Sequence, residues 1–149
     1  MNTKSYLLYI LLFLSSSAYG IDKTFTYSCP DDIAVEVKGA IDSWNHAVNG
    51  IFQAKRVDKD ATITVKEVRK ICGGFRGWTD VESDDHIEIQ IVKDCKHRDV
   101  VVMHEFGHAF GLGHTKDSNS IMYYKAKDEP ILSPDDERRI RRYYGLKAR

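Results

Sequence analysis

Five residues in the stretch 103–122 have the types and the spacing needed to hold a metal ion beside a base. They are His104, Glu105, His108, Gly111 and His114, in the pattern H-E-x-x-H-x-x-G-x-x-H. Residues four apart lie on one face of a helix, so the first two histidines can point at one ion. The glycine accepts a positive φ angle, which allows the helix to end and the chain to turn the third histidine toward the same ion.

This donor set predicts a catalytic zinc centre. Three protein ligands with an open position for water are typical of catalytic zinc, whereas structural zinc has four protein ligands. Glu105 lies next to the first ligand, where it can reach a water on the metal and act as a general base. Three unrelated histidines on a helix and a loop would not explain a glutamate and a glycine at these offsets, so the metal site is favoured.

The elements that must position this centre follow from the hydrophobic periodicity. Apolar residues cover much of the helix expected over 98–110, which should therefore be buried. The cleanest strand is 86–92, in which Ile87, Ile89 and Ile91 alternate with polar residues. A loop over 111–132 leads to a last helix, which starts at the Ser133-Pro134 cap and runs to Tyr144. The other expected elements are a helix over 31–48 and strands over 22–28, 51–57, 61–68 and 75–81.

Two charged segments are interpreted as solvated surface. The segment Glu82-Ser83-Asp84-Asp85 lacks a full calcium-loop pattern, so a simple loop is favoured over a calcium site. The basic run from Arg138 to Arg142 is interpreted as the solvated face of the last helix. The chain has 22 basic and 22 acidic residues, which gives no indication of nucleic acid or an anionic membrane as a partner.

The first 20 residues have the layout of a secretory signal peptide. Lys4 precedes an apolar run over 6–14, and small and polar residues follow up to Gly20. The apolar run is too short to span a bilayer as a helix, although an uncleaved anchor is the alternative. We therefore expect a single mature domain over 21–149, monomeric and free of the membrane after cleavage. It would be secreted to the extracellular space, or to the periplasm if the source is a Gram-negative bacterium.

The chain has three cysteines, Cys29, Cys72 and Cys95. Export favours disulfides, but an odd number leaves at least one thiol without a partner in the chain. We expect Cys72 to pair with Cys95, because the two flank a strand-like region, while other pairings remain open. Cys29 is then expected to be a buried, inert thiol rather than a nucleophile.

The stretch 103–122 resembles the zinc-binding motif of the metzincin clan of metallopeptidases. Ser120-Ile121-Met122-Tyr123 resembles the tight turn, the Met-turn, that carries the clan's methionine. The wording H-E-F-G-H-A-F-G-L-G-H-T-K-D-S-N-S-I-M-Y is most similar to the matrixins, the matrix-metalloproteinase family, as are Leu132-Ser133-Pro134-Asp135-Asp136 and Tyr143-Tyr144-Gly145. Close similarity covers about 100–145, and the N-terminal half agrees only in the order of its elements.

The resemblance implies an α+β, metzincin-like catalytic domain. Its sheet would be twisted and mostly parallel, with four to five strands and three helices, and its Met-turn would lie below the zinc. Gly111 and Met122 would support the site. Tyr124 stands where astacins and serralysins have a tyrosine, which would approach the zinc and assist the transition state; lining the substrate pocket or packing the loop is the alternative.

The same resemblance gives roles to Asp135 and Asp136. One would anchor the backbone of the Met-turn, and the other would accept the α-amino group of Ile21. Simple capping of the last helix is favoured for that second role.

The chain also departs from the matrixins. Matrixins usually carry a propeptide whose cysteine blocks the zinc, whereas the mature chain here is expected to begin almost directly at the first strand, a minimal form without a recognisable propeptide. Cys29 lacks the surrounding pattern. The histidine and aspartate residues that hold a second, structural zinc in matrixins are not recognisable, and His86 alone is not a site. The sequence does not indicate whether calcium is bound.

The sequence thus predicts a secreted zinc-dependent endopeptidase with one catalytic Zn²⁺ and Glu105 as its base. A protein or peptide substrate is expected to lie extended along an edge strand, and the resemblance implies that this strand lies near 75–79. The loop 123–131 would wall a pocket with an apolar or aromatic preference. One alternative is a binding protein or toxin on a metzincin scaffold with narrow or no proteolysis, which would not need Glu105. A hydrolase of non-protein amides is the other, and the Met-turn disfavours it.

Overall fold

The computed structural model describes residues 23–125, 128–129 and 131–147. The predicted signal peptide over 1–20 and the α-amino group of Ile21 lie outside these residues, and so remain predictions. The strands are β1 (Lys23–Ser28), β2 (Phe52–Arg56), β3 (Ile63–Val68), β4 (Gly77–Ser83) and β5 (His86–Val92). The helices are α2 (Ala34–Ala47), α3 (Arg98–Ala109) and α4 (Pro134–Tyr143), with short 3-10 turns η2 (Asp31–Ile33) and η3 (Cys72–Gly74).

The five strands form one mixed sheet in the order β2-β1-β3-β5-β4. Strands β2, β1, β3 and β5 run parallel to one another. Strand β4 pairs with β5 in the antiparallel direction at one edge of the sheet. This confirms the expected α+β architecture, a mostly parallel sheet with three helices. Because β4 has a neighbour on one side only, its other edge is free within the described sheet.

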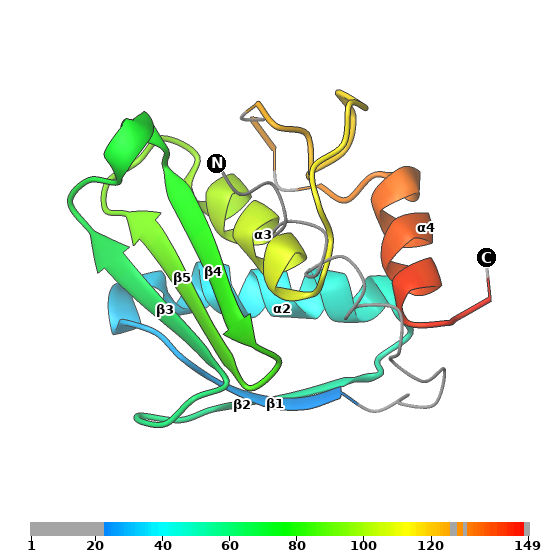
Figure 1. Ribbon diagram of the computed structural model, residues 1–149, viewed down its shortest axis with the longest axis horizontal. Coiled ribbons are helices and arrows are strands. Elements are labelled where there is room, and N and C mark those ends of the chain that lie inside the picture. The colour runs from blue at the N-terminus through cyan, green and yellow to red at the C-terminus, as the bar shows by residue number, and fades with distance from the viewer. Residues whose placement is uncertain (1–22, 126–127, 130, 148–149) are drawn as a thin grey trace, which may run out of the picture.

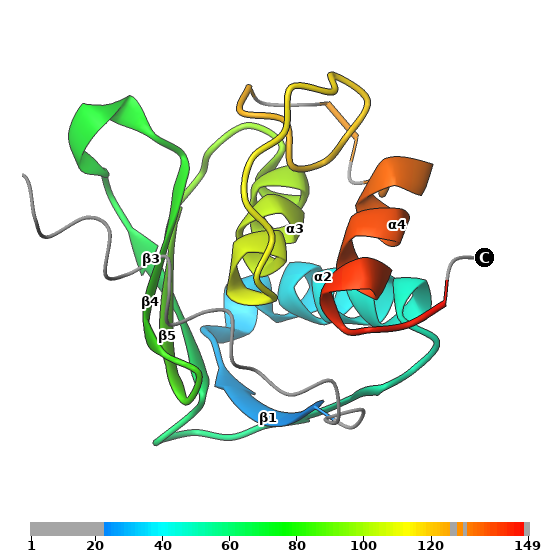
Figure 2. The same cartoon turned by 45° about the vertical axis from the view of Figure 1, so that its right-hand side comes forward.

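The helices all lie on one side of the sheet (Figures 1 and 2). Alternation on β5 explains this arrangement, since Ile87, Ile89 and Ile91 are buried while the residues between them are partly exposed. Trp44 of α2 is fully buried and donates a hydrogen bond from its indole nitrogen to the carbonyl oxygen of Met103, 2.9 Å away. The indole therefore ties α2 directly to the helix that carries the histidines.

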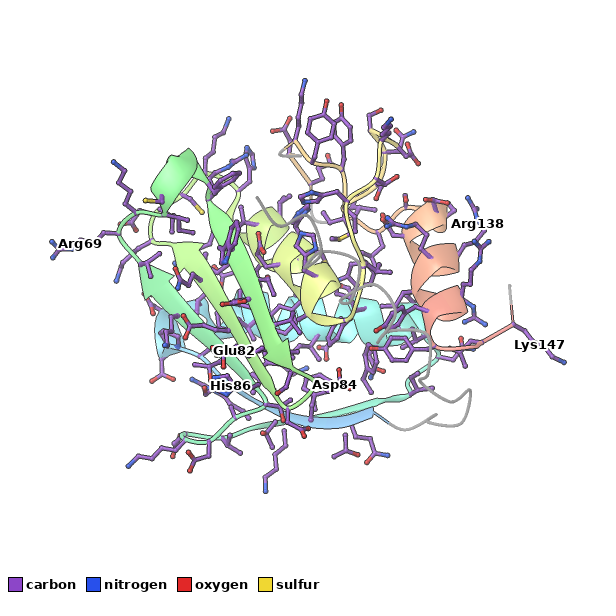
Figure 3. All side chains as sticks on the ribbon, viewed as in Figure 1. Arg69, Glu82, Asp84, His86, Arg138 and Lys147 are labelled. Carbon is purple, nitrogen blue, oxygen red and sulfur yellow. The ribbon has the colours of Figure 1, made fainter. Side chains whose placement is uncertain are left out.

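The hairpin of β4 and β5 is tighter than predicted. The expected loop over Glu82–Asp85 contributes Glu82 and Ser83 to β4, and only Asp84 and Asp85 form the turn. Ser83 pairs with His86, and a register irregularity between Val81 and Ser83 accommodates the extra residue. Figure 3 shows Glu82, Asp84 and His86 together at this end of the sheet. Pairing with a regular neighbouring strand extends the ladder beyond what local composition indicates.

The basic run on α4 is not uniformly solvated, which corrects the prediction. Arg138 is exposed and points away from the body of the molecule (Figure 3). Arg141 is only 5% exposed, and its guanidinium donates to the carbonyl oxygens of Ala47 at 3.1 Å and Lys147 at 2.9 Å. Arg139 donates to the carbonyl oxygen of Gly113 at 2.6 Å. Two of these arginines therefore satisfy carbonyl groups at the ends of neighbouring segments.

All three cysteines are free thiols, so the expected pair of Cys72 and Cys95 is not formed in this structure. The two lie in different surroundings, since Cys72 is exposed at η3 whereas Cys95 packs partly buried against the core. Burial raises the pKa of Cys95 and also that of Cys29, which keeps both thiols protonated and poorly nucleophilic.

No helix in the described part of the chain combines the length and the apolar character that crossing a bilayer requires.

Candidate metal centre

The three histidines meet at the C-terminal end of α3. His104 and His108 project from consecutive turns of the helix. The helix ends at Ala109, Gly111 has a φ of 94°, and the turn returns His114 to the other two rings. The Nε2 atoms of the three rings are 3.1, 3.1 and 3.2 Å apart in pairs. Among the described residues, these three histidines are the one group of at least three potential metal ligands.

Backbone carbonyl groups fix which nitrogen of each helical histidine carries the proton. The Nδ1 of His104 donates to the carbonyl oxygen of Ile121 at 2.7 Å, and the Nδ1 of His108 donates to that of Leu112 at 2.8 Å. Their Nε2 atoms therefore present lone pairs to the common centre. Burial lowers the pKa of His104 to about 4 and also lowers the pKa of His108, so both rings are neutral at physiological pH.

This arrangement fits zinc. Imidazole nitrogens about 2.0–2.1 Å from a tetrahedral zinc ion would lie roughly 3.3 Å from one another. The observed separations of 3.1–3.2 Å are close to that value. Lone pairs that face one another at this distance repel, and a bound cation would remove the repulsion. Three imidazole ligands suit zinc better than the hard cations calcium and magnesium, which prefer oxygen ligands.

Glu105 lies beside the histidines but outside their cluster. It is 6% exposed, and its Oε2 accepts a hydrogen bond from the Oγ1 of Thr79 on β4 at 2.6 Å. Burial raises the pKa of Glu105 to about 7, against the opposing effect of the Thr79 hydroxyl. A carboxyl group whose pKa is near the working pH is suited to take a proton and return it.

Met122 packs against α3, the helix that carries His104 and His108. It is fully buried, and it packs so closely on α3 that a Cβ atom at Gly107 would come 2.2 Å from its Sδ. The turn that carries it is closed by two hydrogen bonds, from the Met122 amide to the Ser120 Oγ at 2.9 Å and from the Tyr123 amide to the Ser120 carbonyl oxygen at 3.2 Å.

Asp136 anchors this turn from the first turn of α4. Its carboxylate accepts hydrogen bonds from the Ser120 hydroxyl and from the amides of Ile121 and Ser133, the last two at 2.8 Å. Ser133 returns a bond from its Oγ to the Asp136 amide at 3.1 Å, which completes a capping box. Because the carbonyl group of Ile121 in turn holds His104, Asp136 is linked to His104 through a single residue. Asp135 is partly exposed and pairs with Arg138 at 3.0 Å.

A cleft of about 1010 Å³ runs past the histidines. The edge strand β4 lines it together with the exposed rings of Phe75 and Trp78, and Tyr123, Tyr124 and Lys125 line it as well. This places the segment 75–79 along the cleft, as the family resemblance implied. Part of the expected pocket wall over 123–131 lies outside the described residues, namely 126, 127 and 130.

A family model described as matrixin, of the peptidase M10 type, matches residues 70–145, just over half of the chain. The chain belongs to the matrixin family. It is also similar to matrilysin of Felis catus, with 43% identity over 53 residues. That match covers 33% of this chain and 20% of matrilysin, so it reaches only a fifth of the relative's length. The matrixin model extends upstream of the histidines through β4 and β5.

Tyr124 of this matrixin is 57% exposed on the cleft wall, and its ring lies 4.6 Å from that of Tyr123. A hydrogen bond with Tyr123 raises the pKa of the Tyr124 phenol, which keeps it protonated and able to donate. Its predicted approach to the metal remains a prediction.

Thr79 and Gly77, which contact Glu105, were not predicted from the sequence, because they are nearly thirty positions away and belong to no motif.

Two helical glycines of the matrixin make a matched pair for testing how closely Met122 packs against α3. A Cβ atom at Gly107 would collide with Met122 and come 2.9 Å from Trp44, whereas one at Gly39 on α2 would meet nothing within 4 Å. We expect Gly107→Ala to lower the free energy of unfolding by about 1–3 kcal/mol through overpacking. Gly39→Ala should raise it by about 0.5–1 kcal/mol through helix propensity. Equal effects in urea unfolding would show that Met122 does not pack against α3.

The burial of Glu105 should make the stability of the zinc-free matrixin depend on pH. Its pKa is about 7 in the folded state and has an ordinary value of 4.5, so the folded state binds more protons between these values. Stability should therefore fall as the pH rises from 4.5 to 7, by at most roughly 3 kcal/mol from this group. Glu105→Gln should remove this loss. Thermal unfolding in chelator should show the variant more stable than the parent at pH 8 and similar to it at pH 4.5; parallel curves would contradict the burial of a charged Glu105.

Proposed function

We propose that this matrixin is a secreted zinc endopeptidase. One observation carries the proposal: three histidine nitrogens converge beside a buried carboxylate, in a cleft that has a free strand edge along one wall. Zinc ligands, a base and a strand edge for a peptide are the parts that metal-assisted peptide hydrolysis requires. Export is supported by the signal-like segment over 1–20.

Each described residue has a definite task in this proposal. His104, His108 and His114 would hold a zinc ion that, when bound, supplies an activated water and polarises the scissile carbonyl group. Glu105 takes a proton from the attacking water as a general base and then donates it to the nitrogen of the leaving amine. Met122 and Asp136 take no part in proton transfer. Asp136 keeps His104 in place through Ile121, and Met122 packs against α3.

The substrate would be an extended peptide that pairs with the free edge of β4. Main-chain hydrogen bonds to an exposed strand hold a peptide irrespective of its sequence, and alternate side chains then enter or leave the cleft. The exposed rings of Phe75, Trp78 and Tyr124 favour apolar or aromatic side chains next to the cleaved bond.

A cleavage assay tests this function. The purified chain, with residues 1–20 removed, would be incubated with a peptide library before and after treatment with a zinc chelator. We expect cleavage within peptides, loss of cleavage in chelator and recovery when zinc is added back. Binding of one zinc ion without cleavage of any peptide would contradict the proposal and would favour a binding protein on the same scaffold.

A further inference from the structure

The structure places one polar side chain of the cleft wall directly on the proposed base. We propose that Thr79, on the edge strand β4, is a positioning residue that holds the carboxylate of Glu105 in its reactive orientation. This inference rests on the proposed function, because the orientation matters for hydrolysis only if Glu105 is the base. It concerns a residue outside the histidine motif and on a different element, 26 positions earlier in the chain.

The contact between the two side chains is short and direct. The Oγ1 of Thr79 donates to the Oε2 of Glu105 at 2.6 Å, a length typical of a hydroxyl that donates to an ionised carboxylate. The same hydroxyl lies 3.1 Å from the carbonyl oxygen of Glu105. A hydroxyl has a single proton, so the shorter contact takes the larger share of it. The hydroxyl therefore holds mainly the carboxylate of Glu105 and lies close to its backbone carbonyl group.

The second carboxylate oxygen is confined by Gly77. A Cβ atom at Gly77 would come 2.5 Å from the Oε1 of Glu105 and 2.7 Å from its Cγ. Gly77 and Thr79 are two positions apart on a strand, so they face the same side. β4 therefore presents bare backbone to one carboxylate oxygen and a hydroxyl donor to the other.

This confinement matters because a glutamate side chain has three rotatable bonds. Glu105 is 6% exposed, and its desolvated carboxylate needs hydrogen-bond donors. Without the Thr79 hydroxyl, rotation of the carboxylate out of the cleft wall toward water would be energetically favourable. The rotation would remove the base from the position beside the metal ligands.

The same strand also offers its free edge to the substrate. β4 pairs with β5 on one side through Thr79 and Ile89, among others, and lies next to α3 (Figure 1). A peptide that docks along β4 is thus aligned by the element that orients the base. Loss of the Thr79 hydroxyl should lower the rate of the chemical step while leaving the main-chain docking of the substrate intact.

The test compares Thr79→Val, which keeps the shape of the side chain, with Thr79→Ser, which keeps the hydroxyl. We expect Thr79→Val to lower kcat by about 10- to 100-fold with KM changed by less than about threefold. Thr79→Ser should stay within about threefold of the parent in kcat. Thr64→Val removes a threonine hydroxyl from β3, which β5 separates from β4, and should leave kcat unchanged. Zinc content and thermal unfolding verify that each variant is folded, and Thr79→Ala is a second hydroxyl-free variant.

A double-mutant cycle separates positioning from substrate binding. In the Glu105→Ala background, Thr79→Val should have no further effect on the residual rate. An equal loss in both backgrounds, or full kcat in Thr79→Val, would overturn the inference.

A crystal structure keeps the inference testable even if the parent cleaves no peptide, an outcome that would refute the proposed function itself. In zinc-loaded Thr79→Val, the Glu105 carboxylate should have left the position that it occupies in the zinc-loaded parent. An unchanged position would show that Thr79 does not hold it.

Discussion

Replacing Glu105 by glutamine is expected to lower kcat/KM for peptide cleavage by about 10²–10⁴-fold. Glutamine has nearly the same shape and can still accept the hydrogen bond from Thr79, but it cannot take a proton from water. The three histidines are unchanged, and burial and carbonyl hydrogen bonds fix His104 and His108 independently of Glu105. The variant should therefore still bind one zinc ion, as measured by metal analysis beside the kinetic assay.

Glu88→Gln provides the control for this substitution. Glu88 lies on β5 and pairs with Lys66 on β3, outside the group of residues that line the cleft. Its replacement removes the same charge from the chain without touching the proposed base, and kcat/KM should remain within about twofold of the parent. Full activity of Glu105→Gln would exclude Glu105 as the base. Loss of both zinc and activity would assign Glu105 a part in holding the metal site together.

Replacing Asp136 by alanine is expected to lower the free energy of unfolding by about 3–5 kcal/mol. The carboxylate is fully buried, and its loss would leave the Ser120 hydroxyl and the amides of Ile121 and Ser133 without their acceptor. Because Ile121 holds His104, zinc affinity should also fall, by about 10- to 100-fold. Denaturant unfolding of the zinc-free chain and a competition titration with a chelating dye measure the two effects separately.

Asp135→Ala is the matched control for this prediction. Asp135 is the preceding residue in the same helical turn, and it pairs only with the exposed Arg138 in the contacts described above. Its replacement should cost less than about 1 kcal/mol and leave zinc affinity unchanged. Similar losses for the two aspartates would show that helix capping, rather than the anchoring of the Met-turn, accounts for the effect.

The residues that gather at the centre by local geometry could be predicted from the sequence. His104 and His108 are brought together by one helical turn, and Gly111 and His114 follow within six residues. The alternation of Ile87, Ile89 and Ile91 likewise predicts a half-buried strand, because neighbouring positions on a strand face opposite sides. The anchoring of the Met-turn by an aspartate was inferred only through family resemblance. In the structure, Asp136 accepts a hydrogen bond from the backbone amide of Ile121 in this turn.

Contacts between distant segments could not be predicted in this way. Arg141 was assigned to a solvated run because its neighbours in the sequence are basic, yet its guanidinium is covered by the ends of α2 and of the chain segment at Lys147. Nothing local marks Thr79 as a partner of Glu105. The contact forms because β4 pairs antiparallel with β5 and so lies beside α3. The strand expected over 75–81 lies two residues further along, at 77–83, because pairing with β5 rather than composition defines its ends.

The free edge of β4 also bears on whether copies of this protein associate through their sheets. A strand that exposes unpaired amide and carbonyl groups together with Trp78 and Val81 is a template on which copies of the same chain can aggregate. Asp80 and Glu82 project charge from the same strand, and the irregularity between Val81 and Ser83 interrupts its flat ladder. These features disfavour long-lived pairing of β4 strands between molecules. A short extended peptide can still bind to the edge and dissociate from it. The proposed peptide cleavage would require the same property, because an edge that kept its first guest would not release the cut peptide.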